Sequence, residues 1–155
     1  MTKKFFRKII NKKNTEIKLI AEMSGNHQGS FRGADKFVKQ AIKSGADIIK
    51  FQVYKAETIT LNSNKKDFLI SKDGAWGKFK NLYDLYDEAH TPWQWISKLA
   101  SLLDSKNFPW FASAFDETSV DFLEKINCQA YKIASPEITD IPLIEKIAST
   151  KKPII

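Results

Sequence analysis

The stretch ADIIKFQVYK, residues 46–55, has the composition of a β-strand buried in a protein core. Side chains alternate along a strand, so its apolar and polar side chains separate onto two faces. One face is apolar and holds Ile49, Phe51 and Val53. The other holds Lys50 and Gln52 and continues into Tyr54. Because removing an ammonium group from water is unfavourable unless it meets a partner, Lys50 predicts a polar site on that face.

Apolar strands and amphipathic helices alternate on both sides of this stretch. The clearest helix, residues 33–45, places apolar side chains on one stripe at helical spacing. Thr91 and Pro92 predict the start of a further helix. Two more helices are predicted to begin at the N-cap residues Asp116 and Asp140. Strands are predicted at residues 17–22, 46–53, 108–115 and 130–135, and KKPII at 151–155 begins a fifth.

This alternation predicts an α/β protein with a parallel sheet, because parallel strands are joined through crossover helices. Two architectures fit the order, an open doubly wound sheet and a (β/α)₈ barrel. A dinucleotide-binding sheet carries a glycine-rich phosphate loop after its first strand, and none follows residues 17–22. Residues 55–91 form a long polar stretch around one short helix, NLYDLYDEA, and a loop of that length is usually functional.

Polar side chains recur on one face of all four strands, near the carboxyl end of each. They are Glu22, Lys50, Gln52, Ser113 and Lys132, followed by Ser135 and Glu137 just beyond the fourth strand. A sheet covered by helices on both faces offers no simple reason for this set. A barrel does, because one face of every strand lines its interior and ligand sites form at the carboxyl mouth. The polar set therefore favours the barrel.

The chemistry of this set suits an anionic substrate. Ammonium and hydroxyl groups bind phosphate or carboxylate, and a carboxylate can move a proton or orient a hydroxyl group. Two other interpretations stay open from the residues alone. Lys50–Glu22 and Lys132–Glu137 could be buried ion pairs with no further role, or one lysine could form a Schiff base with a carbonyl substrate.

The two histidines predict no metal site. His27 lies in SGNHQGS, the loop after the first strand, and His90 lies in EAHTPW before a helix. Their separation matches no metal-binding spacing. A lone histidine is more often structural than a ligand, so we expect structural roles for both.

The composition is that of a globular protein. The chain has 155 residues, of which 43% are hydrophobic, enough for one domain with a core. No apolar run reaches the roughly 20 residues of a membrane span, and no signal peptide is recognisable. Cys128 is the single cysteine, so an internal disulfide is excluded, and these features favour the cytoplasm. The net charge of +7 suits anionic substrates.

Part of the positive charge lies in residues 1–16, which begin MTKKFFRKIINKKN. We expect these residues to form a basic flap in front of a domain that spans residues 17–155. The alternative is an arm that binds RNA or a membrane surface. The flap is preferred because its apolar residues can pack against the domain, so neither a nucleic-acid nor a membrane partner is expected. These apolar residues are Phe5, Phe6, Ile9 and Ile10.

Four longer motifs carry a resemblance to a known family. They are IAEMSGNHQGS, GADIIKFQVYKAETITL, FASAFDETSVDFLEKI and AYKIASPEITDIPLIEKIASTKKPII, in that order. Together they resemble the sialic acid synthase family from about residue 17 onward. The segment GAWGKFKNLYDLYDEAHTPWQW is similar to the pseudaminic acid synthase branch. N-acetylneuraminate and legionaminic acid synthases are the alternatives within the family.

The resemblance implies a (β/α)₈ TIM barrel followed by a small antifreeze-like domain, in a homodimer. It also implies a carbon–carbon bond-forming transferase of surface glycan biosynthesis. Such an enzyme condenses phosphoenolpyruvate with the open-chain aldehyde of an N-acetylated amino sugar to a nine-carbon 2-keto sugar acid. A divalent metal, Mn²⁺ or Mg²⁺, polarises the aldehyde. The chemistry needs no imine, which disfavours the Schiff base.

The resemblance also implies roles for the polar set. Glu22 is similar to the carboxylate at the reacting centre. Gln52 and Glu137 are similar to sugar contacts. The phosphoenolpyruvate ligands implied are Lys50, Ser113, Lys132 and Ser135. The family's metal-binding histidines lie in the second half of the barrel, so no metal ligand is expected in this chain.

The length of the chain limits what it is expected to do alone. A (β/α)₈ barrel needs about 250 residues, so the resemblance implies a truncated N-terminal half with four βα units and the start of a fifth strand. We expect no condensation by these 155 residues alone. An alternative of another class is a non-catalytic remnant with weak anion binding, since a half barrel leaves strand edges exposed.

Overall fold

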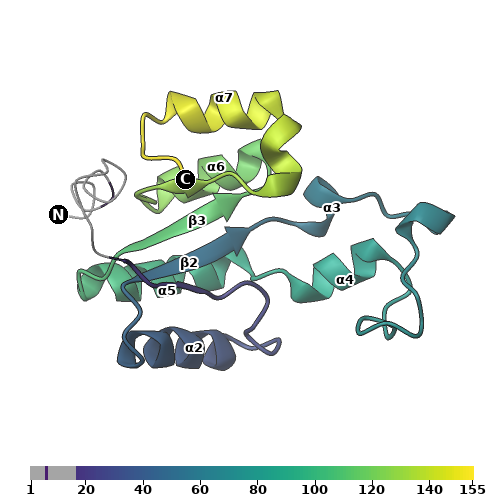
Figure 1. Cartoon of the computed structure of the whole chain (residues 1–155), viewed down its shortest axis with the longest axis horizontal. Helices are drawn as coiled ribbons and strands as arrows, with labels where there is room; N and C mark the ends of the chain where they lie inside the picture. Colours follow the sequence, from purple (N-terminus) through teal and green to yellow (C-terminus); the bar gives the residue numbers. More distant parts are fainter. Residues whose placement is uncertain (1–5, 7–16) are drawn as a thin grey trace.

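The computed structural model describes Phe6 and residues 17–155. Four parallel strands form one sheet in the order β1-β2-β3-β4, which is also their order in the chain. Their bounds are Ile20–Glu22, Ile48–Val53, Trp110–Ala114 and Tyr131–Lys132. The expected fifth strand begins beside β4, because Ile154 forms a parallel bridge with Tyr131. Figure 1 shows the chain end returning to that edge of the sheet.

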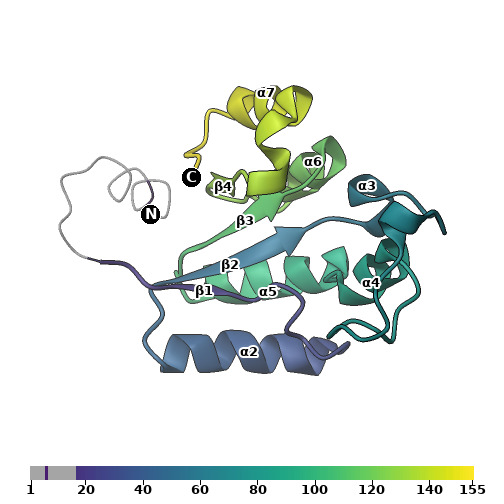
Figure 2. The same ribbon diagram turned by 45° about the vertical axis from the view of Figure 1, so that its right-hand side comes forward.

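The long helices all pack on one face of the sheet. They are α2 (Phe31–Lys43), α5 (Trp93–Ser105), α6 (Glu117–Lys125) and α7 (Ile141–Ser149). Figures 1 and 2 show them following one another around the sheet in chain order. One apolar core joins these helices to the outward side chains of the strands, among them Ile49, Phe51 and Val53. Helices on a single face are the arrangement of a barrel, so the predicted barrel-type α/β fold of four βα units is confirmed.

The shorter elements lie in the connections. After β2 come α3 (Ala56–Ile59), the 3₁₀ turn η1 (Lys66–Phe68) and α4 (Leu82–Ala89), and a second 3₁₀ turn, η2 (Ser135–Thr139), follows β4. The predicted helix NLYDLYDEA is α4, and its N-cap is Asn81. Asp116 and Asp140 cap α6 and α7 as expected, each accepting a backbone amide three residues on.

One predicted cap is wrong. Thr91 does not cap α5, whose N-cap residue is Pro92 without a side-chain bond. The Thr91 hydroxyl instead donates to the Ser24 carbonyl oxygen at 3.3 Å. A contact with a loop 67 residues earlier therefore replaces the local one.

The inner face of the sheet is apolar at the amino ends of the strands. Ile48, Phe111 and Ala130 form a small buried cluster there with Phe6. The Phe6 and Phe111 rings meet edge to face, with centroids 5.6 Å apart. The other residues of the expected N-terminal flap lie outside the described part of the chain. Among the residues described, no helix has the length and apolar content to cross a membrane.

Candidate functional site

The polar residues of the inner face meet across neighbouring strands. Glu22 lies opposite Lys50 in the register of β1 and β2. One step towards the carboxyl ends, Ser113 lies opposite Gln52 on one side and Lys132 on the other. The structure therefore brings these five predicted residues together in two adjacent rows, next to the apolar cluster that contains Phe6.

Glu22 and Lys50 form an ion pair at the centre of this group. Their side chains are 32% and 18% exposed, so both remain within reach of solvent and of a ligand. The second carboxylate oxygen of Glu22 accepts the Ser24 backbone amide at 3.1 Å. The pair is thus oriented by the loop that follows β1, while the carboxylate and the ammonium both face the inner side of the sheet.

Gln52 and Ser113 are held on the same face. The Ser24 hydroxyl donates to the carboxamide oxygen of Gln52 at 3.3 Å, which turns the amide nitrogen of Gln52 away from Ser24. Ser113 is 1% exposed, deep in the group. A buried hydroxyl beside an amide and an ammonium is suited to hydrogen-bond an anion.

The end of β4 contributes a second lysine and a second carboxyl group. The Lys132 ammonium donates to the Ile133 carbonyl oxygen rather than to Glu137. One oxygen of Glu137 is buried without a hydrogen-bond partner among the described residues. Burial raises the pKa of Glu137, with a further contribution from Asp140, against the opposing effects of a backbone hydrogen bond and of Lys132. Ser135, the first residue of η2, is exposed at the same end of the sheet.

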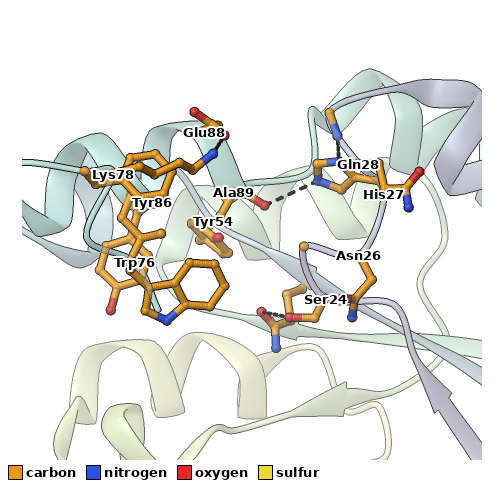
Figure 3. Close-up of a pocket in the computed structure, with 15 residues that line it drawn as sticks. Ser24, Asn26, His27, Gln28, Tyr54, Trp76, Lys78, Tyr86, Glu88 and Ala89 are labelled. Carbon is orange, nitrogen blue, oxygen red and sulfur yellow. Dashed lines mark hydrogen bonds and ion pairs between the residues drawn. The ribbon is translucent and has the colours of Figure 1, made fainter. Parts of the chain in front are cut away.

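A cavity of about 580 Å³ opens beside this group, between the loop after β1 and the segment that leads into α4. Figure 3 shows Ser24, Asn26 and His27 on one side and Trp76, Lys78 and Tyr86 on the other. Of the seven predicted site residues, Gln52 alone lines both the polar group and this cavity. The polar group and the cavity are therefore neighbouring compartments that share one side chain.

His27 joins the two walls of the cavity. It is 2% exposed, and its Nδ1 accepts the Gly29 amide at 3.2 Å while Nε2 lies 3.3 Å from the Ala89 carbonyl oxygen. Both contacts are satisfied by the neutral ring with hydrogen on Nε2. Its ring also packs edge to face on Trp95. The structural role expected for His27 follows from these contacts, which fasten the loop after β1 to the end of α4.

Gly33 lets this loop approach α2 closely. A Cβ atom at Gly33 would lie 2.1 Å from the His27 carbonyl oxygen, which is part of the backbone. We expect Gly33→Ala to lower the free energy of unfolding by about 1–3 kcal/mol, because the loop must move away from the helix. Thermal unfolding would measure this effect. Arg32→Ala, at an exposed neighbouring position of the same helix, is the matched control, and equal melting temperatures for the two variants would contradict the expectation.

No group of three or more metal-ligating side chains occurs among residues 17–155 and Phe6. His90 is engaged locally, with Nδ1 2.6 Å from the Asp87 carbonyl oxygen. The residues present do not fit a divalent metal, and no chemical step is assigned to one here.

Sequence reasoning missed the aromatic side chains that line the cavity. Trp76 and Tyr86 come from the long stretch between β2 and α5, and Tyr54 from the end of β2. The unusual length of that stretch was the one feature of the sequence that pointed to a functional role for it. Which residues face one another across the cavity is decided by contacts between distant segments, such as that of His27 with Ala89, and the sequence does not show these contacts.

Comparisons with known proteins agree with the fold. Residues 37–155 match the model of the NeuB family. The pseudaminic acid synthase of Campylobacter jejuni subsp. jejuni serotype O:2 is 45% identical over 144 residues, which cover 92% of this chain and 41% of that protein. The pseudaminic acid synthase of Helicobacter pylori is 42% identical over 138 residues, covering 89% of this chain and 40% of that protein.

A solved structure gives the same result. The N-acetylneuraminic acid synthetase of Leptospira borgpetersenii, in complex with citrate, superposes with a TM-score of 0.73 at 26% identity. The match covers 90% of this chain and 44% of that one. The chain thus spans about two fifths of the length of the relatives it matches. The family match covers well over half of the chain, and the chain therefore belongs to the NeuB family.

Proposed function

We propose that this chain forms the first half of a synthase barrel that condenses phosphoenolpyruvate with an N-acetylated amino sugar. The observation that carries the proposal is the juxtaposition of Glu22, Lys50, Gln52, Ser113 and Lys132 beside a cavity at the carboxyl ends of parallel strands. Similarity to pseudaminic acid synthases over 92% of the chain supports it. The product would be a nine-carbon 2-keto sugar acid used in surface glycans.

The lysines and hydroxyl groups are proposed to bind phosphoenolpyruvate. Lys50 and Lys132 supply positive charge from β2 and β4, and Ser113 supplies a buried hydroxyl between them. Ser135 adds a hydroxyl group at the exposed start of η2. Two cations with hydroxyl donors on one face are what a substrate carrying both a phosphate and a carboxylate requires.

Glu22 is proposed to act at the reacting carbon atoms. In the reaction, C3 of phosphoenolpyruvate forms a bond to the aldehyde carbon, whose oxygen gains a proton. Water then adds at C2, and phosphate leaves with cleavage of the bond between C2 and oxygen. Glu22 faces the inner side of the sheet beside Lys50, where its carboxylate can accept a proton from the attacking water or orient a sugar hydroxyl.

Gln52 and Glu137 are proposed to contact the amino sugar. Gln52 lies at the boundary between the polar group and the cavity, so it can reach a sugar that enters from the cavity side. Glu137 has a buried oxygen without a hydrogen-bond partner among the residues described and a raised pKa, so a sugar hydroxyl would satisfy it.

The remaining parts of the active site are proposed to lie outside this chain. A divalent metal, Mn²⁺ or Mg²⁺, would polarise the sugar aldehyde from ligands in the second half of the barrel. The sheet leaves apolar side chains exposed near both of its edges, which supports packing against further strands. They are Leu19 just before β1, Ile20 at the start of β1, and Ile154 and Ile155 beside β4. A homodimer in the cytoplasm is the proposed form of the complete enzyme.

The pseudaminic type of substrate is preferred within the family. The two pseudaminic acid synthases described above are 45% and 42% identical to this chain, whereas the N,N′-diacetyllegionaminic acid synthase of Legionella pneumophila is 33% identical. The proposed sugar is a 2,4-diacetamido-2,4,6-trideoxyhexose, and N-acetylmannosamine is the comparison substrate.

Phosphate release tests the proposal. We expect the complete synthase to release phosphate from phosphoenolpyruvate when the amino sugar and Mn²⁺ are added, and the chain of residues 1–155 to release none. The reason is that the second half of the barrel wall and the metal ligands are proposed to lie outside this chain. Turnover by residues 1–155 alone would contradict the division of the site, and a complete synthase that uses neither sugar would contradict the proposed reaction.

A further inference from the structure

The cavity beside the polar group has a different chemistry from the group itself. The only charged residues among those lining it are Lys78 and Glu88, and they form an ion pair with each other. The polar group also contains an ion pair, Lys50 with Glu22, but its second lysine, Lys132, contacts a backbone carbonyl oxygen and adds a positive charge. One compartment is positively charged and its neighbour carries no net charge, so the two suit different ligands, one anionic and one neutral.

Aromatic rings dominate the side of the cavity formed by the stretch before α5. Trp76 is 57% exposed, although it borders a cavity. Tyr86 and Tyr54 meet edge to face, with centroids 6.1 Å apart, and Phe79 and Leu85 lie beside them. Figure 3 shows Trp76, Tyr54 and Tyr86 gathered on this side. An exposed indole next to further rings is the kind of surface that receives an apolar group of a ligand.

Backbone contacts constrain the conformation of the segment that carries Trp76. Residues 69–81 are closed at their base by an antiparallel bridge between Leu69 and Asn81. Inside, the Phe79 amide donates to the Trp76 carbonyl oxygen at 3.0 Å. A Cβ atom at Gly77 would lie 2.0 Å from the Lys72 carbonyl oxygen, so the backbone packs against itself next to Trp76. An indole on a preformed segment is a contact surface that loses little entropy when a ligand binds.

The opposite side of the cavity is polar and uncharged. It is formed by Ser24, Asn26 and Gln28, with Gln52 at the boundary to the polar group. On the aromatic side, burial raises the pKa of Tyr54 to about 12, with a contribution from the neighbouring Tyr86, so the Tyr54 phenol stays protonated and uncharged. A ligand that fills this cavity would present hydroxyl or amide groups to one side and apolar groups to the other.

We infer that Trp76 and Tyr86 form a specificity wall that contacts the methyl-bearing end of the amino sugar. The methyl groups would be those of an acetamido substituent and of a carbon that lacks its hydroxyl group. This inference rests on the proposed function and adds to it the residues that select the sugar. A sugar with hydroxyl groups at that end would leave them facing aromatic rings without hydrogen-bond partners, which disfavours its binding.

The test compares two sugars in the complete synthase and its Trp76→Ala variant. We expect the variant to lose about 10-fold or more in kcat/KM for the 2,4-diacetamido-2,4,6-trideoxyhexose, through KM, as for other losses of apolar contact in a pocket. Its preference for that sugar over N-acetylmannosamine should narrow by a similar factor. KM for phosphoenolpyruvate should change less than about twofold, because the lysines lie in the other compartment.

Two further variants make the test specific. Trp76→Phe keeps an aromatic ring and should restore most of the preference. Leu61→Ala, an exposed apolar residue of the same connection that does not line the cavity, should leave the preference unchanged. If the synthase is active but Trp76→Ala keeps its preference, the specificity wall is refuted while the proposed function stands. If the parent synthase condenses neither sugar, the proposed function fails, and the specificity wall fails with it.

Discussion

The Lys50→Met variant of the complete synthase should lose about 10²- to 10³-fold in kcat/KM for phosphoenolpyruvate, the effect typical of removing one preorganised donor to an anion. Methionine keeps the length of the side chain and removes its charge. Lys50 lies at the centre of the polar group, between Glu22 on β1 and the residues of β3. We expect most of the loss in KM for phosphoenolpyruvate, with a smaller change in KM for the sugar.

Lys39→Met is the matched control for this prediction. Lys39 also forms an ion pair, with Asp35 at 2.7 Å, but on the solvent side of α2. Exposed pairs contribute little, so this variant should keep its kinetic constants. Lys50→Arg retains the positive charge and should recover part of the activity, although a guanidinium group does not reproduce the geometry of an ammonium. Unchanged kinetics in Lys50→Met would show that Lys50 does not bind the anion.

Replacing Glu22 with glutamine should lower kcat by about 10²- to 10⁴-fold, the range found when a proton-transfer group is lost. Glutamine preserves the size of the side chain and can still accept the Ser24 amide, which Glu22 does at 3.1 Å. The loss should therefore reflect the missing charge rather than a moved loop. We expect KM for phosphoenolpyruvate to change much less than kcat, which is the opposite of the pattern predicted for Lys50→Met.

The control for Glu22→Gln is Glu57→Gln. Glu57 pairs with Lys55 at 3.8 Å in an exposed position at the start of α3. It lies outside the polar group and should tolerate the change. The ratio of the changes in kcat and KM gives a second readout, since a lost proton-transfer group should lower kcat much more than it changes KM. A Glu22→Gln enzyme with the parent kcat and the parent KM values would assign Glu22 a purely structural role.

The strand faces could be predicted from the sequence because alternation is a local property. Lys50 and Gln52 share a face simply because they are two residues apart. The same reasoning placed Ser113 and Lys132, and the register of the sheet then brought them side by side. The alternation of side chains does not predict where each strand begins and ends. β4 contains only Tyr131–Lys132, because the chain turns into a 3₁₀ segment at Ser135.

The cavity could not be predicted for a different physical reason. Apart from Gln52 and Tyr54, its lining residues come from residues 24–29 and 76–89, which carry no repeating pattern and meet through contacts between distant segments. Thr91 illustrates the difficulty, since its hydroxyl donates a hydrogen bond to the Ser24 carbonyl oxygen instead of capping α5. Motifs that follow a period are therefore visible in the sequence, whereas surfaces assembled from loops are not.

The apolar cluster beside the polar group has an electrostatic consequence. Phe6, Ile48, Phe111 and Ala130 are almost completely buried next to the polar group, and Phe111 lies directly beside Lys50 in the sheet register. The Lys50 side chain therefore lies next to buried apolar groups rather than open solvent on the amino-terminal side of the sheet. An anion bound there would experience a stronger attraction than at an equally charged surface site, because less solvent screens it. Phe6, from the start of the chain, thereby helps to set the field in which the anion is held.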